Sequence, residues 1–204
     1  MSDRHEPTPA QLVAMLERAQ ALARRAMDAG HHPFGALLVA ADHETVLIEQ
    51  GNVDSVNHAE AVLARDAARR FSPAELWPCT LVTTVEPCAM CAGTQYWANI
   101  GRTVFGIDEK ALLAITGNHA ENPTLDLPCR QRLRARPEGH QGDTARWPQT
   151  SEAIAALHRR YWRSRARRGQ PRRRHQATGE RACSGRTPMP SRRARTGAAA
   201  AACA

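Results

Sequence analysis

The chain has 204 residues, 42% of them hydrophobic, which fits one domain with a substantial core. Its formal net charge is +8. No apolar run approaches the roughly 18 residues of a membrane span, and the N-terminus has no apolar signal region, so we expect a cytoplasmic protein without a membrane partner. The charge is uneven. Residues 163–204 hold twelve arginines and one acidic residue, whereas 1–162 carry a net charge of −3, which argues against nucleic-acid binding by the body of the protein.

The N-terminal part of the chain is predicted to form one helix and a pair of strands. Apolar residues at three- and four-residue steps indicate an amphipathic helix over 9–29, which Thr8 can cap and Gly30 ends. Two apolar runs, 34–40 and 45–50, are separated by a short polar stretch. This pattern is typical of a β-hairpin.

Helices and strands then alternate along the chain. We expect helices over 58–71, 88–98 and 108–115, separated by strands over 79–85 and 102–107. Together with the hairpin, this alternation indicates an α/β fold of three layers, α/β/α, with a mixed, mostly parallel central sheet.

The C-terminal part carries weaker signals. Residues 129–136 are predicted to form a helical turn, 137–150 are poorly defined because they show no usable periodicity, and 152–162 are predicted to form a last helix. We therefore expect one folded domain over 1–162. The Arg-rich segment 163–204 is expected to be disordered, either as a genuine extension or as the product of a shifted reading frame.

Two short motifs place metal-binding residue types at the starts of predicted helices. His58 and Glu60 begin one helix, and Cys88 and Cys91 begin another directly after a strand and Pro87. Cysteines three residues apart share a helix face, and a helix N-terminus favours the thiolate form. One imidazole and two thiolates make three ligands, one fewer than in a structural zinc site, so a fourth position stays open for water. The carboxylate of Glu60 is placed to move protons beside it.

These motifs carry a family resemblance. The pattern His58-Ala59-Glu60 followed by Pro87-Cys88-Ala89-Met90-Cys91 is the zinc-deaminase signature. Residues 10–130 resemble the cytosine/guanine deaminase and tRNA-adenosine deaminase branch of the cytidine-deaminase-like superfamily, through HPFGALLV (32–39), NHAEAVLAR (57–65), VEPCAMCAG (85–93) and IGRTVFGI (100–107). The resemblance implies that fold and one zinc ion per chain, held by His58, Cys88 and Cys91. It also implies hydrolytic deamination with Glu60 as the proton carrier.

The resemblance also suggests three residues that contact the substrate. Asn52 is expected to hydrogen-bond the ring, although it could simply be a turn asparagine. Ala59 is expected to offer its backbone N–H, and Phe34 to form a pocket wall or to be an ordinary core residue.

Four further residues have simpler interpretations. Tyr96 and Trp97 are expected in core packing or a dimer contact, Glu86 to favour a helix N-terminus by its charge, and Cys129 to be structural.

Three functions remain open at this point. The first is deamination of a small-molecule nucleobase or nucleoside, guanine- or cytosine-like, by a homodimer, and the acidic body favours it. The second is a tRNA-specific adenosine deaminase that uses the Arg-rich segment to bind phosphates. The third is a non-catalytic zinc module with a nucleic-acid-binding tail, against which the presence of Glu60 argues.

Overall fold

Five strands form one mixed sheet in the order β2-β1-β3-β4-β5. Their bounds are β1 (Gly35–Val39), β2 (Val46–Gly51), β3 (Thr80–Val85), β4 (Arg102–Ile107) and β5 (Thr144–Arg146). Strand β1 is antiparallel to both β2 and β3, whereas β4 is parallel to both β3 and β5. All strands except β1 therefore run in one direction, which confirms the mixed, mostly parallel sheet.

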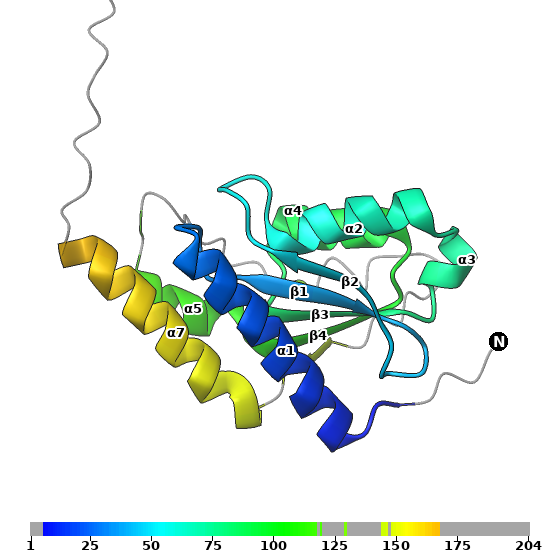
Figure 1. Ribbon diagram of the computed structural model, residues 1–204, viewed down its shortest axis with the longest axis horizontal. Helices are drawn as coiled ribbons and strands as arrows, with labels where there is room; N and C mark the ends of the chain where they lie inside the picture. Colours follow the sequence, from blue (N-terminus) through cyan, green and yellow to red (C-terminus); the bar gives the residue numbers. More distant parts are fainter. Residues whose placement is uncertain (1–5, 118, 120–128, 130–143, 147, 168–204) are drawn as a thin grey trace, which may run out of the picture. The chain divides into compact units, whose positions relative to one another are not determined.

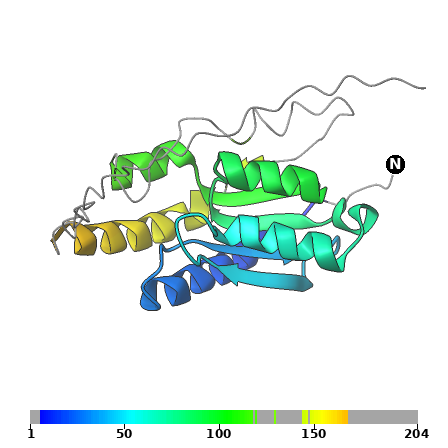
Figure 2. The same ribbon diagram turned by 90° about the horizontal axis from the view of Figure 1, so that it is seen from above.

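Helices cover both faces of this sheet (Figure 1). Helices α1 and α7 contact each other and pack on one face, while α2 and α4 pack on the other, side by side in Figure 2. Helix α5 contacts α7. The three-layer prediction is confirmed. The helices are α1 (Pro9–Asp28), α2 (Ala59–Arg70), α3 (Pro73–Leu76), α4 (Ala89–Ala98), α5 (Glu109–Thr116) and α7 (Pro148–Arg167).

The computed structural model describes residues 6–117, 119, 129, 144–146 and 148–167, which belong to one compact unit. Much of 137–150 and the segment from 168 onward lie outside the described residues. Among the residues that the structure describes, no helix has the length and apolar character needed to cross a membrane.

The last helix is longer than its sequence pattern suggested. It was expected over 152–162 but runs from Pro148 to Arg167, so the first residues of the Arg-rich segment are helical. The short elements α3 and β5 were not expected. Neither is long enough to display a hydrophobic period. β5 exists through its pairing with β4, whereas α3 begins with a local capping box between Ser72 and Glu75.

The interior strand β1 fixes the spacing of the layers. Its side chains alternate, so that Leu37 and Val39 pack with α1 while Ala36 and Leu38 pack with α2. At the start of β1 the backbone of α1 comes very close, because a Cβ added to Gly35 would lie 2.3 Å from the carbonyl oxygen of Ala19. Glycine is required here, and the close approach sets the position of the loop that precedes β1.

Candidate active site

The metal-binding residue types gather at one end of the sheet, where two helices begin. His58 is the N-cap of α2 and Cys88 is the N-cap of α4, both with extended backbone, and Cys91 lies in the first turn of α4. The segments that lead into these helices follow β2 and β3, which point the same way. The carboxyl ends of such strands are the usual place for a ligand site in an α/β sheet.

The donor atoms of His58, Cys88 and Cys91 form a nearly equilateral triangle. The two Sγ atoms are 3.6 Å apart, and each lies 3.6 Å from Nδ1 of His58. In a tetrahedral zinc site with Zn–S about 2.3 Å and Zn–N about 2.0 Å, such donors lie about 3.5–3.8 Å apart. The three residues therefore fit one zinc ion, and they supply three protein ligands.

Contacts within this group shift the pKa values of its three residues. The pKa of Cys88 is lowered to about 4, mainly by its hydrogen bond with Cys91 and also by His58. The hydrogen bond with Cys88 raises the pKa of His58, and the hydrogen bond with Cys88 together with burial raises the pKa of Cys91. The lowered pKa of Cys88 agrees with the thiolate character expected at the start of α4.

Glu60 lies directly beside this group and is only 4% exposed. Its Oε2 is 3.5 Å from Sγ of Cys91, and its Oε1 accepts a 2.6 Å hydrogen bond from the hydroxyl of Thr83. Burial raises the pKa of Glu60, while the bond from Thr83 opposes that shift. A carboxyl group held next to a metal-binding triangle and largely removed from water suits proton transfer.

Of the three expected substrate contacts, Ala59 and Phe34 lie next to His58, and the backbone N–H of Asn52 donates to the carbonyl oxygen of Phe34. Asn52 follows β2 and is 3% exposed; its amide donates to the carbonyl oxygen of Asp54, and its Oδ1 has no hydrogen-bond donor among the residues that the structure describes. Ala59 is the first residue of α2, a position whose N–H has no acceptor within the helix. The ring of Phe34 is nearly parallel to that of His58, with centroids 6.2 Å apart.

Thr83, which contacts Glu60, and His158, which contacts Phe34, are two residues near the site that sequence reasoning missed. Thr83 lies in an apolar strand, where its hydroxyl gives no signal of function. His158 lies on α7, and its ring centroid is 5.0 Å from that of Phe34, across a long separation in sequence.

The simpler interpretations of Glu86 and Trp97 need correction. Glu86 does not act at the N-terminus of α4, because its carboxylate accepts hydrogen bonds from the backbone N–H of Glu109, which begins α5, and of Cys129. Core packing is wrong for Trp97, whose side chain is 84% exposed.

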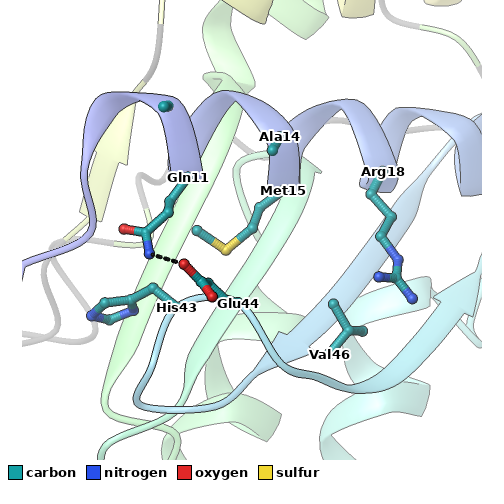
Figure 3. Close-up of a pocket in the computed structure, with 8 residues that line it drawn as sticks. Gln11, Ala14, Met15, Arg18, His43, Glu44 and Val46 are labelled. Carbon is teal, nitrogen blue, oxygen red and sulfur yellow. Dashed lines mark hydrogen bonds between the residues drawn. The ribbon is translucent and has the colours of Figure 1, made fainter.

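A surface pocket of about 360 Å³ lies elsewhere, between α1 and the turn that joins β1 to β2 (Figure 3). Met15, Arg18 and Val46 line it, and Gln11 donates a hydrogen bond to Glu44 across one side. None of the expected site residues lines this pocket, so the pocket is separate from the candidate site at the starts of α2 and α4.

Comparison with known proteins identifies the family. The family model described as "Cytidine and deoxycytidylate deaminase zinc-binding region" matches residues 9–107. A probable cytosine deaminase of Schizosaccharomyces pombe is 36% identical over 129 residues, which cover 60% of this chain and 76% of that protein. This chain belongs to the cytidine and deoxycytidylate deaminase family. The deaminase has zinc as its cofactor, since the zinc-binding region contains the whole His58, Cys88 and Cys91 group.

Other relatives of the deaminase differ in their named substrates. A tRNA-specific adenosine deaminase of Haemophilus influenzae is 36% identical over 100 residues, 47% of this chain and 57% of that protein. A solved guanine deaminase from Nitrosomonas europaea shares the fold, with a TM-score of 0.59, 24% identity, and coverage of 80% of this chain and 98% of that chain. The chain thus spans less than two thirds of the Haemophilus protein. All three names are those of deaminases.

Proposed function

We propose that this deaminase is a zinc-dependent hydrolase that converts an exocyclic amine of a free nucleobase or nucleoside, guanine- or cytosine-like, into a carbonyl and releases ammonia. The observation that carries the proposal is the placement of the Glu60 carboxyl group, 3.5 Å from one sulfur of a triangle that fits zinc. A purely structural site needs no such carboxylate. The relatives named as cytosine and guanine deaminases support the choice of substrate class.

The proposed reaction consumes one water molecule and releases one molecule of ammonia. When bound, zinc supplies the Lewis acidity that makes water a nucleophile near neutral pH. In the proposed reaction Glu60 takes a proton from the attacking water and passes it to the ring nitrogen. Glu60 then carries the second proton to the amine, which leaves as ammonia while the oxygen of water remains as the carbonyl. One carboxylate makes both transfers.

Substrate orientation is assigned to the residues around the metal group. The Oδ1 of Asn52, which has no donor among the described residues, is proposed to accept a hydrogen bond from a ring N–H, since a buried oxygen is costly to leave unmet. The backbone N–H of Ala59 is proposed to donate to a ring oxygen or nitrogen. Phe34 is proposed to form the apolar wall against which the ring lies.

Elemental analysis of variants tests the assignment of the ligands. His58→Ala and Cys88→Ala should lose the single zinc ion per chain, because two donors do not hold the metal tightly. A full zinc complement in Cys91→Ala would show that the ligand set is wrong.

We also propose that the enzyme is a homodimer. The exposed indole of Trp97, next to Tyr96 at the end of α4, supports a contact surface there, since large aromatic side chains are enriched in interfaces.

A second candidate function is deamination of adenosine in tRNA. The Haemophilus relative and the arginines of 163–204 favour it, since such a segment gains affinity for phosphates by counterion release. The deciding experiment measures ammonia release from cytosine, guanine, adenine, their nucleosides and a tRNA anticodon stem-loop. Release from free bases or nucleosides is expected. Release from the stem-loop alone would establish the second candidate instead.

A further inference from the structure

A short loop between β2 and α2 is held together by the carboxylate of Asp54. Oδ1 of Asp54 accepts hydrogen bonds from the backbone N–H groups of Val56, at 2.8 Å, and of Asn57, at 2.6 Å. Oδ2 of Asp54 accepts a third hydrogen bond, of 2.8 Å, from the side-chain amide of Asn57. The backbone N–H of Val53 donates to the carbonyl oxygen of Asn57, which closes the loop over 53–57.

The apolar core contributes little to the shape of this loop, because residues 53–56 are exposed. An exposed segment is ordered mainly by its local hydrogen bonds. Aspartate is a frequent residue in such turns because its carboxylate accepts bonds from the backbone N–H groups that follow it. The conformation of the 53–57 loop therefore depends on Asp54.

The loop contacts the site in two places. The side-chain amide of Asn52 donates a 2.9 Å hydrogen bond to the carbonyl oxygen of Asp54. This bond uses the nitrogen of the amide and leaves its Oδ1 for another group. Further along the loop, the ring of His58 is hydrogen-bonded to the backbone of Ser55. Metal-binding histidines are commonly held by a bond of this kind, which sets the tautomer and the direction of the ring.

We propose that Asp54 is a positioning residue for both the metal ligand His58 and the substrate contact Asn52. Its carboxylate keeps the loop in the shape in which Ser55 meets the ring of His58. The same shape places the carbonyl oxygen of Asp54 against the amide of Asn52. The role toward His58 depends on the metal site alone, whereas the role toward Asn52 rests on the proposed function. Without the carboxylate all ligands remain, but the ring and the amide are less well oriented, so zinc and substrate bind more weakly.

The turn between β1 and β2 provides a matched control. Oδ1 of Asp42 accepts hydrogen bonds from the backbone N–H groups of Glu44 and Thr45, and Oδ2 accepts one from the hydroxyl of Thr45. Phe34 precedes β1 and this turn follows it, so the turn lies at the opposite end of the strand from the metal group. Asp42→Ala therefore removes the same kind of contacts away from the site.

The experiment compares Asp54→Ala, Asp54→Asn and Asp42→Ala with wild type. One readout is zinc affinity, measured in competition with a chelator. The others are the unfolding temperature and, at saturating zinc, KM and kcat for the free base or nucleoside that wild type deaminates.

Asp54→Ala should bind zinc about tenfold more weakly and raise KM about tenfold, with a smaller change in kcat. Asp54→Asn should stay within about threefold of wild type in zinc affinity and KM, because the amide oxygen still accepts the two backbone bonds. Asp42→Ala should also stay within about threefold in both. The two alanine variants should lower the unfolding temperature alike, since each loses the same kind of turn contacts.

Unchanged zinc affinity in Asp54→Ala would overturn the role toward His58, and an unchanged KM would overturn the role toward Asn52. Equal losses in Asp42→Ala or in Asp54→Asn would overturn both. If Asp54→Ala does not fold, Asp54→Ser, which keeps a weaker acceptor, should show smaller losses in the same direction, and wild-type values would overturn the inference. Wild type that releases ammonia from no free base or nucleoside would instead refute the proposed function, and the zinc affinities would still test the role toward His58.

Discussion

The hydroxyl of Thr83 donates a 2.6 Å hydrogen bond to Oε1 of Glu60. Thr83 lies on the central strand β3 and Glu60 in the first turn of α2, so the bond joins the sheet to the helix that carries the metal-binding histidine. It leaves Oε2 of Glu60 on the side of Cys91. The carboxyl group that we assign to proton transfer is therefore oriented by the core of the fold.

Thr83→Val removes this bond at nearly constant volume. We expect turnover to fall by about tenfold, the factor that corresponds to roughly 1.4 kcal/mol, because one hydrogen bond to a charged group is lost. The zinc content should not change. Thr80→Val is the matched control on the same strand, since the buried hydroxyl of Thr80 has no partner among the described residues. Equal losses in both variants would mean that Thr83 only supports the strand.

Folding stability should depend on pH through His158. Burial, and to a lesser degree the nearby His32, lower the pKa of His158 from 6.5 to about 3. Between these values the unfolded chain binds a proton that the folded chain does not. Stability should therefore be present above about pH 6.5 and should fall as the pH drops toward 3, by up to about 1.4 kcal/mol per unit.

Denaturant unfolding of wild type and His158→Phe across this range isolates the effect, because other groups titrate alike in both proteins. The stability of wild type relative to the variant should decrease steadily as the pH falls. A constant difference would show that His158 does not stay neutral in the folded state.

The sequence predicted the metal group because its signal is local. Two short motifs, one at the start of α2 and one at the start of α4, carry the three ligands. They bring His58, Cys88 and Cys91 together once α2 and α4 pack side by side. The long periodic helices and strands were predicted for the same reason.

Contacts across the fold were not predictable in this way. Thr83 contacts Glu60 only because α2 packs against the sheet that contains β3. His158 contacts Phe34 only because α7 packs beside α1. The strand β5 is too short to show a pattern and exists through its pairing with β4.

Trp97 provides a test of the homodimer. We expect wild type to be dimeric by light scattering and Trp97→Arg to be monomeric, because a charge replaces an interfacial aromatic ring. Trp97→Phe should remain dimeric. The exposed position of Trp97 means that neither change should lower the unfolding temperature of the monomer. A monomeric wild type at micromolar concentration would contradict the proposal.

Deletion of 168–204 distinguishes the two candidate functions while leaving α7 intact. The deleted residues carry nine arginines and one glutamate, and a free base offers no phosphate for them to bind. We expect kcat/KM for the small substrate to stay within about threefold, well below the tenfold effect of 1.4 kcal/mol. A large, salt-dependent loss of tRNA deamination would favour the tRNA function.

The most direct test of the account is the turnover of Glu60→Gln, measured as ammonia released per zinc ion. Glutamine keeps the volume of Glu60 and its hydrogen bond from Thr83 but does not carry protons, so the fold and the zinc content should match wild type. The account predicts a fall in turnover of at least ~10²-fold, the lower end of the range for general acid–base catalysis. Turnover near that of wild type at full zinc content would contradict it.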